Sequence, residues 1–376
     1  MQITTTKAEL ASHLNFVSGA ADPRGTVPML STVLLKATAA GKLSMLCSDT
    51  AVLARAMSPC QVAKEGEIAI DARRFGDLIR AFPDGKQSIV LSIEEKGSLL
   101  IKSGRSRFRL PTLPAADYPR MTSEKVERIS ITMSAKRIAN MIDDVSSAMA
   151  ISDVRTFLNG TLFSIDKEGL WCVATDGHRL NVAFEPIEGA DRLKEASVIV
   201  PRKTVLLAKK MMGQSETVKL TIGPNDIQFT LEDATVILGK GIDGKFPNWR
   251  GVLPKTTRTT TITASQFNGH ISLIKASMDA GVTKDAATKN RIDLTLGGNT
   301  ALIQCGEDGR CEIEAVSSDN TVTQIPFNID FLIDAASVAV GSGEKIVIGY
   351  ENNSAAILMH PDGAEYPLCV VMPMRG

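Results

Sequence analysis

Apolar and polar residues alternate with helical spacing after Pro201, directly behind a run of β-branched apolar residues. The segment reads VIVPRKTVLLAKKMM from Val198 to Met212, which predicts a short strand followed by a basic amphipathic helix. Two other segments have the same order: IAIDARRFGDLIRAF begins at Ile68 and IPFNIDFLIDAASVAV begins at Ile325. The starts lie 130 and 127 residues apart, so the pattern predicts three similar domains in one chain.

The hydrophobic pattern predicts one further helix and several strands in each domain. Helices are expected over residues 7–20, 73–82, 135–148 and 265–278, besides those that follow residues 198 and 325. Strands are expected at 32–37, 43–48, 89–93, 99–103, 107–110, 129–133, 157–165, 170–174, 218–222, 227–231, 235–238, 259–263, 291–296, 301–304 and 311–315. Proline-rich turns place the domains at 1–125, 126–256 and 257–376, each an α+β layer with two helices on one sheet face.

Composition narrows the class of protein without naming it. A hydrophobic content of 44% with 22% charged residues is ordinary for a folded globular chain. We expect a cytoplasmic protein, because no apolar run reaches the roughly 18 residues of a membrane span and the first residues do not resemble a signal peptide. Six cysteines are scattered without any CxxC pair, so we expect reduced core residues, with no metal site and no cofactor.

The distribution of charge along the chain is more informative than its sum. Lys plus Arg equals Asp plus Glu at 42 each, so net charge alone predicts no nucleic-acid partner. A single basic helix usually has a solvated face, but two equivalent helices are basic here, whereas the third carries Asp330 and Asp334. The basic residues are Arg73, Arg74 and Arg80 in the first helix and Arg202, Lys203, Lys209 and Lys210 in the second.

The string ATDGHRL at 174–180 has two interpretations. In the first, His178 is a general base oriented by Asp176, as in a hydrolytic enzyme. No nucleophile stands at motif spacing, and no second histidine lies nearby to complete a metal site. In the second, TDG is a hairpin turn in which Gly177 supplies a positive φ. The residues alone favour the turn and leave the enzyme as the competing hypothesis.

The C-terminal segment, CVVMPMRG from Cys369 to Gly376, places two methionines around a proline. Methionine side chains adapt to several partners and are common on binding surfaces. The same residues could equally pack a terminal strand, so the segment alone does not decide between a core and a binding role.

Several long strings of this chain, in order and at matching spacing, resemble the bacterial sliding clamps, the β subunits of DNA polymerase III. The resemblance spans the whole length. It rests on GRSRFRLPTLPAADYP at 104–119, VRTFLNG at 154–160, ATDGHRL at 174–180, VIVPRK at 198–203, DGKFPNWRGVLPK at 243–255 and VVMPMR at 370–375.

The resemblance implies a processivity factor that is not an enzyme. Family members are head-to-tail homodimeric rings whose helices line a hole around duplex DNA, which they contact without reading its sequence. By resemblance, the residues facing DNA are Arg24, Arg73, Arg74, Arg80, Arg202, Lys203 and Lys210. The dimer contact is implied to join Arg105 and Arg107 of one chain to Glu307, Asp308, Glu312 and Glu314 of the other. The apolar part of that contact corresponds to residues 281–283, which are less apolar here.

The family also binds partner peptides in a groove between its second and third domains. Its partners are the DNA polymerase III α subunit, the clamp loader δ subunit, other polymerases and repair proteins, through peptides with a Gln followed by Leu or Phe. An apolar, methionine-lined groove suits several extended peptides. Gly251 stands where the family often has Arg, which implies a more open wall. The implied wall residues are Leu158, Thr175, Gly177, His178, Arg179, Leu180, Pro247, Val252, Val370, Met372, Pro373, Met374 and Arg375.

Overall fold

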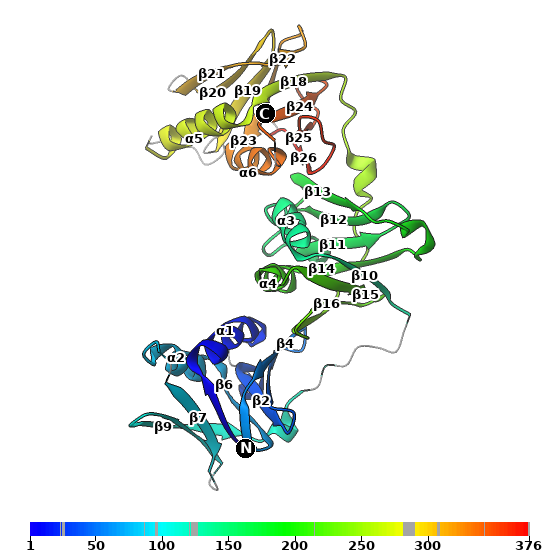
Figure 1. The fold of residues 1–376 in the computed structure, drawn as a ribbon. Helices are drawn as coiled ribbons and strands as arrows, with labels where there is room; N and C mark the ends of the chain where they lie inside the picture. The colour runs from blue at the N-terminus through cyan, green and yellow to red at the C-terminus, as the bar shows by residue number, and fades with distance from the viewer. Residues whose placement is uncertain are drawn as a thin grey trace. The chain divides into compact units, whose positions relative to one another are not determined.

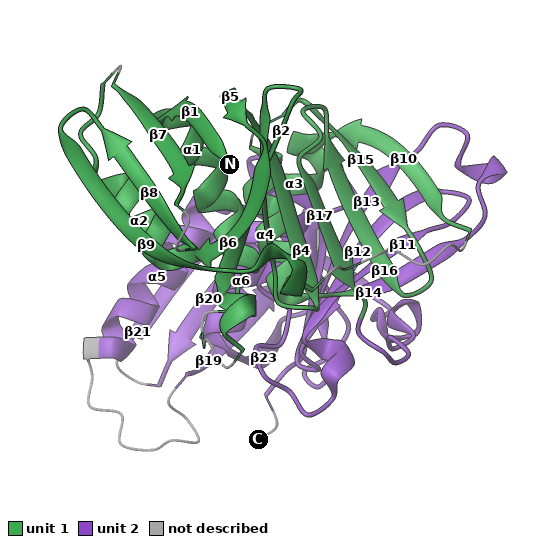
Figure 2. Ribbon diagram, turned by 90° about the horizontal axis from the view of Figure 1, so that it is seen from below, with its two compact units in different colours: residues 1–139, 200–241 green, residues 140–199, 242–376 purple. Residues whose placement is uncertain are grey.

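The computed structural model describes residues 1–22, 24, 27–85, 87–94, 97–119, 121, 127–213, 215–280, 290–306, 309–341 and 343–374. The chain divides into two compact units, coloured separately in Figure 2. Unit 1 comprises Met1–Ala139 and Val200–Gly241, and unit 2 comprises Asn140–Ile199 and Ile242–Gly376.

Unit 1 is built mainly from strands, with helices against them (Figure 1). Its elements are β1 (Gln2–Thr6), α1 (Lys7–Val17), β2 (Thr32–Thr38), β3 (Lys42–Ser48), β4 (Val52–Pro59), β5 (Gln61–Lys64), β6 (Gly66–Asp71), α2 (Ala72–Ala81), β7 (Ser88–Ile93), β8 (Ser98–Ser103), β9 (Ser106–Leu113), β10 (Ile129–Ser134), α4 (Arg202–Met212), β15 (Thr217–Ile222), β16 (Asp226–Leu231) and β17 (Val236–Lys240). Helix α3 (Ala135–Ser146) begins in unit 1 and ends in unit 2.

The strands of unit 1 form one antiparallel sheet in the order β10-β15-β16-β17-β4-β3-β2-β6-β9-β8-β7-β1-β5. Near its middle, Val236–Gly239 of β17 lie opposite Val52–Arg55 of β4. Helix α1 contacts β3, β4, α2 and α4. It buries Leu10, Leu14 and Val17 completely, as expected for one apolar face at helical spacing.

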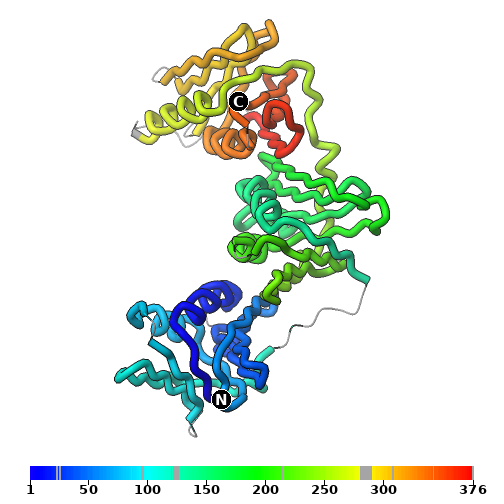
Figure 3. Tube along the Cα trace, viewed as in Figure 1, coloured from blue at the N-terminus to red at the C-terminus, as the bar shows by residue number. Residues whose placement is uncertain are grey.

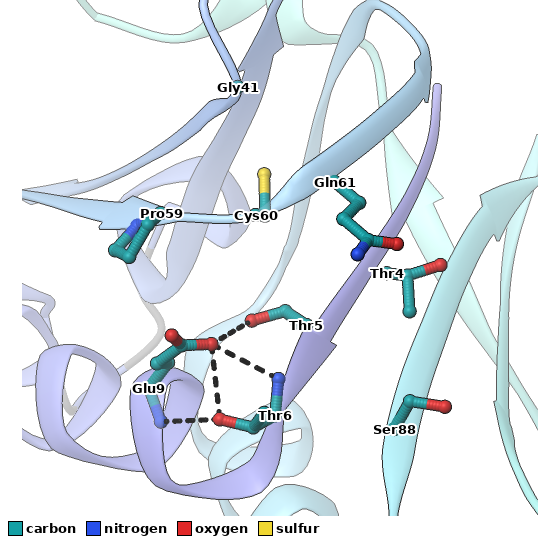
Figure 4. A pocket seen from close by; sticks show the side chains of 9 residues that line it. All are labelled: Thr4, Thr5, Thr6, Glu9, Gly41, Pro59, Cys60, Gln61 and Ser88. Atoms are coloured by element: carbon teal, nitrogen blue, oxygen red, sulfur yellow. Dashed lines mark hydrogen bonds between the residues drawn. The ribbon is translucent and has the colours of Figure 1, made fainter.

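The start of α1 is fixed by a capping box, drawn in Figure 4 beside a cavity of about 390 Å³. The Glu9 amide donates to Thr6 Oγ1 at 3.3 Å, and the Thr6 amide donates back to Glu9 Oε2 at 3.3 Å. Glu9 Oε2 also accepts from Thr5 Oγ1 at 2.9 Å. This reciprocal pairing satisfies backbone donors at the start of the helix. The Glu9 carboxylate beside the cavity is therefore a helix cap.

The described residues of unit 2 form two sheets. The larger has the order β14-β11-β12-β13-β26-β25-β24-β18-β22 and the smaller β21-β20-β19-β23. Their elements are β11 (Gly160–Ile165), β12 (Gly169–Thr175), β13 (Arg179–Pro186), β14 (Ala196–Pro201), β18 (Arg258–Thr263), α5 (Ala264–Ala280), β19 (Arg291–Gly297), β20 (Thr300–Cys305), β21 (Gly309–Glu314), β22 (Ser317–Ser318), β23 (Thr323–Asn328), α6 (Ile329–Ala339), β24 (Lys345–Tyr350), β25 (Ile357–Pro361) and β26 (Leu368–Val371).

The larger sheet of unit 2 joins segments that are distant in sequence. Arg179–Val182 of β13 pair with Leu368–Val371 of β26, where the red C-terminal end of the trace in Figure 3 lies beside a green segment. Helix α6 packs on β25 and β26, and α5 packs on β20 and β21. The last strand of the chain therefore completes the sheet that contains the ATDGHRL string.

The α+β prediction and its repeated strand–helix pattern are confirmed. The three segments noted first become β6–α2, β14–α4 and β23–α6. Three predicted boundaries were wrong by three residues. Strand β9 ends at Leu113 instead of Leu110. Helix α1 ends at Val17 and continues only as a 3₁₀ turn, Ser18–Ala20. Strand β11 begins at Gly160, since Thr156–Leu158 form the 3₁₀ turn η4.

The prediction that the cysteines are core residues holds for three of the six, since Cys60, Cys305 and Cys311 are half-buried. Cys47, Cys172 and Cys369 are buried, which raises the pKa of each thiol. Among the described residues, no group of His, Cys, Asp and Glu side chains could hold a metal ion, and no helix combines the length and hydropathy needed to cross a membrane.

Candidate functional site

The ATDGHRL string forms the hairpin turn between β12 and β13, and Gly177 has a φ of 90°. Asp176 Oδ1 accepts from the backbone amides of His178 at 2.9 Å and Arg179 at 3.0 Å, while Oδ2 accepts from Arg179 Nε at 3.0 Å. Both carboxylate oxygens thus hold the turn. The predicted hairpin geometry is present, and Asp176 has a structural task in it.

The turn brings most of the predicted groove wall together inside unit 2. Leu180 pairs with Val370 across β13 and β26, and the Met372 amide donates to the His178 carbonyl at 2.9 Å. Leu158, Leu180 and Val370 are at most 4% exposed, whereas Val252 is 58% exposed and Met372 48%. The predicted residues therefore combine a buried apolar base with exposed apolar side chains. Thr175, Arg179, Pro373 and Met374 are half-buried, and Gly177, His178 and Pro247 are exposed.

Helix α6 supports this wall through Arg179. The Arg179 guanidinium donates from Nη1 to Asp334 Oδ2 at 2.5 Å and lies 4.6 Å from the centre of the Phe331 ring. The His178 ring stacks on the same phenyl ring, with centroids 6.0 Å apart. Asp334 and Phe331 were not predicted as site residues. Nothing in the local sequence could reveal them, because 155 residues separate Arg179 from Asp334.

A short loop before β11 places Leu158. Arg155 donates from Nε and Nη2 to the two oxygens of Asp153, at 3.0 and 2.9 Å, and the Asp153 amide donates to Asn159 Oδ1 at 2.8 Å. The hydrogen bonds from the Arg155 side chain and then from the Arg155 backbone amide lower the pKa of the Asp153 carboxyl group to about 2. Two large apolar residues of the loop region, Ile151 and Val154, are 84% and 96% exposed.

The arginines predicted to face DNA in α2 gather around one cavity of unit 1, of about 700 Å³. Arg73, Arg74 and Arg80 are all exposed, and so is Arg24. Asp77 accepts from Arg80 Nη2 at 2.5 Å, so this surface mixes both signs of charge. The complete lining is Ser18, Ala21, Asp22, Ser31, Asp71, Ala72, Arg73, Arg74, Asp77 and Arg80.

The basic residues of α4 are arranged differently. Lys203 Nζ is bound to Asp49 Oδ2 at 2.6 Å and donates to the carbonyls of Ala21 and Ala20 at 3.0 and 3.3 Å. Lys210 Nζ donates to the Asn15 carbonyl at 2.9 Å. These lysines fasten α4 to the end of α1. Their predicted role toward DNA stays a prediction, as does that of Arg202, which is half-buried at the helix start.

The strands predicted to form the dimer contact both have open edges. Within the described residues, Ser106–Pro111 of β9 pair only with β8, and β21 pairs only with β20. Arg105 and Arg107 are exposed at the start of β9, and Glu312 and Glu314 are exposed on β21. Open edges offer unpaired backbone groups to another strand. Glu307, Asp308, Arg375 and residues 281–283 lie outside the described residues.

Comparison with known proteins decides the family. Two family models match the chain. The model described as "DNA polymerase III beta subunit, N-terminal domain" matches residues 1–122, and the model described as "DNA polymerase III beta subunit, central domain" matches residues 132–248. A beta sliding clamp of Pseudomonas putida is 32% identical over 382 residues, with 100% of both chains covered, and that of Salmonella typhimurium is 30% identical over 381 residues at the same coverage. The chain belongs to the bacterial β sliding clamp family.

The solved structures agree with this membership. The DNA polymerase III subunit beta from Pseudomonas aeruginosa has a TM-score of 0.89 at 29% identity, covering 100% of both chains. A sliding clamp from Bacillus subtilis has a TM-score of 0.90 at 20% identity, which supports the fold. Sliding clamps are processivity factors of DNA replication, and this chain has that role.

Arg250, which was not predicted as a site residue, holds the turn that carries Val252 of the predicted groove wall. Its guanidinium lies 4.3 Å from the Trp249 ring centre and 4.7 Å from that of Trp171, and Nη2 donates to Asp166 Oδ2 at 3.0 Å. Arg250 belongs to the 3₁₀ turn η6 (Trp249–Val252), which also carries exposed Val252. The string NWRG was a signal for the family, but not for this stacking.

We expect Arg250→Ala to lower the free energy of unfolding by about 1–2 kcal/mol, through loss of two cation–π contacts and one partly exposed ion pair. Denaturant titration followed by tryptophan fluorescence measures this locally, since Trp171 and Trp249 are the two tryptophans of the chain. Lys245→Ala, at an exposed cation of the same segment, is the control. An unchanged transition in Arg250→Ala would show that the stack is energetically neutral.

Proposed function

We propose that two copies of this chain close head to tail into a ring that encircles duplex DNA without reading its sequence. Each copy contributes three clamp domains, at residues 1–125, 126–256 and 257–376. The observation that carries the proposal is the pair of open strand edges with opposite charge, β9 with Arg105 and Arg107, and β21 with Glu312 and Glu314. Such edges allow a heterologous, head-to-tail contact, and a ring of two chains contains this contact twice.

The proposed DNA contact is weak and nonspecific. Arg73, Arg74, Arg80 and Arg24 are exposed cations, so they suit phosphate contacts that position the duplex. The carboxylates around α2 reduce the net positive charge there, which suits a protein that must slide. Retention on DNA then depends on enclosure by the ring.

The proposed partners bind at the wall formed by the β12–β13 turn and the C-terminal segment. We propose that the α subunit of DNA polymerase III, the δ subunit of the clamp loader, and other polymerases and repair proteins insert short peptides there. The protein acts in the cytoplasm and is not itself an enzyme. This agrees with Asp176, whose carboxylate is engaged in holding the turn.

Two measurements on the full chain test the ring. We expect a solution mass of about twice the 40.3 kDa of one chain. After loading by a clamp loader, gel filtration should show the protein retained on nicked circular DNA and lost when the same DNA is linearised, because a ring slides off free ends. Equal retention on both forms would contradict enclosure.

A further inference from the structure

A basic trough of about 970 Å³ lies in unit 2 beside the C-terminal segment. It is formed where the first residues of β18, β19 and β23 meet the turn between β24 and β25 and the residues after β26. Its lining is Arg258, Arg291, Asp293, Thr321, Val322, Thr323, Gln324, Pro326, Asn352, Asn353, Ser354, Met372, Pro373 and Met374.

The trough is continuous with the proposed peptide wall. Met372, Pro373 and Met374 belong both to the predicted wall and to the trough lining. Their backbone is held at both ends: the Met372 amide donates to the His178 carbonyl at 2.9 Å, and the Met374 amide donates to the Pro326 carbonyl at 2.8 Å. An extended peptide on the wall can therefore reach the trough with residues that flank its apolar side chains.

The charge of the trough indicates what those flanking residues would be. Arg258 Nη1 donates to Thr323 Oγ1 at 3.2 Å and has no carboxylate within ion-pair distance among the residues the structure describes. Arg291 Nη2 lies 3.8 Å from Asp293 Oδ1, which is a loose contact, and the Arg291 side chain is 35% exposed. Two guanidinium groups thus face a single lining carboxylate. Guanidinium groups bind carboxylates with paired, charge-assisted hydrogen bonds.

We propose that this basic trough is a second subsite of the partner surface, which binds a carboxylate side chain flanking the apolar residues of a clamp-binding peptide. The inference rests on the peptide-binding role proposed above. Arg258 and Arg291 then discriminate among partners, favouring peptides with an acidic flank over peptides with a neutral or basic one.

Synthetic peptides test this on the full-length protein. The core probe contains Gln followed by Leu and Phe, and it is compared with versions that carry Asp-Asp, Asn-Asn or Lys-Lys at the amino-terminal or carboxyl-terminal side. At low ionic strength we expect Asp-Asp at one of the two ends to tighten binding about three- to ten-fold over Asn-Asn, and Lys-Lys there to weaken it. The difference should shrink in high salt, because the trough is open to solvent.

Substitutions assign the effect to the trough. Arg258→Gln and Arg291→Gln should each reduce the Asp-Asp advantage and together abolish it, with the affinity of the core probe unchanged. Lys167→Gln, at an exposed cation of the same unit outside the trough lining, is the matched control and should leave the advantage intact.

The possible outcomes distinguish failure of the proposed carboxylate subsite from failure of the proposed peptide-binding role. If the core probe fails to bind, the proposed peptide role fails. If the core probe binds and acidic flanks give no advantage at either end, or an advantage that survives the double substitution, the trough is not a carboxylate subsite. Loss of DNA retention in the arginine variants, with the peptide series unchanged, would assign the trough to nucleic acid and overturn the proposal.

Discussion

Met372→Asp is expected to weaken binding of a clamp-binding peptide about 100-fold, equivalent to about 2.7 kcal/mol. The Met372 side chain is 48% exposed in the free chain, and its backbone is held by the His178 carbonyl. A peptide that covers this position would lose its apolar contact with the methionine side chain and would have to desolvate the new carboxylate, and these costs exceed what an exposed ion pair with Arg258 or Arg291 returns. Fluorescence anisotropy of a labelled peptide measures the change in affinity.

The control for Met372→Asp is Val316→Asp, which places the same charge on a side chain of similar exposure, 51%, outside the proposed wall. Val316→Asp should retain normal peptide affinity. Both variants should keep the unfolding midpoint of the parent, because each position is already in contact with water. Normal peptide affinity in Met372→Asp would remove the C-terminal segment from the binding surface.

The second large effect is expected on dimerisation. Arg107→Glu and Glu312→Lys should each raise the dimer dissociation constant about ten- to hundred-fold. A head-to-tail dimer contains the β9–β21 contact twice, so a loss of about 0.7–1.4 kcal/mol at each contact is doubled. The combination of both substitutions in one chain should recover most of the affinity, because opposite charges again face each other. Sedimentation velocity at a series of protein concentrations measures these constants.

Arg55→Glu is the matched control for the dimer variants. Arg55 is an exposed arginine of β4, an internal strand of the unit 1 sheet with neighbours β3 and β17 on its two sides. Reversal of its charge should leave dimerisation unchanged. If the two interface substitutions add to each other instead of compensating, β9 and β21 do not face one another in the dimer.

The sequence predicted the elements with clear local periodicity. Each strand–helix pair was recognisable because a run of apolar β-branched residues is followed by apolar residues at helical spacing, as in β14–α4. Strands β4 and β13 were missed for a different reason. In β4, the buried face carries the small or polar residues Ala54, Ala56 and Ser58, so the strand gives only a weak apolar signal in the sequence. In β13, Asn181 is 2% exposed and looks out of place in an apolar strand.

Partners distant in sequence explain the residues that local patterns misjudge. The Asn181 side chain is satisfied by the Asp144 carbonyl at 2.8 Å and by Ser147 Oγ at 3.2 Å. Lys203 looks like a solvent-facing helix residue, yet Asp49, 154 residues away, holds its ammonium group. Arg179 depends in the same way on Asp334. Such pairings exist only after the chain has folded, so spacing along the sequence carries no trace of them.

The pairing of β17 with β4 determines where the proposed ring can be opened. Residues Val236–Gly239 and Val52–Arg55 link the segments that match the central and N-terminal family models, and β13 with β26 forms a similar seam in unit 2. Separating either seam breaks backbone hydrogen bonds within one sheet. In the proposed ring the joints between chains lie at β9 and β21, outside these seams, so a clamp loader would separate two chains there without breaking a sheet inside either chain. The proposed twofold ring has two such joints, so one could open while the other holds the two chains together.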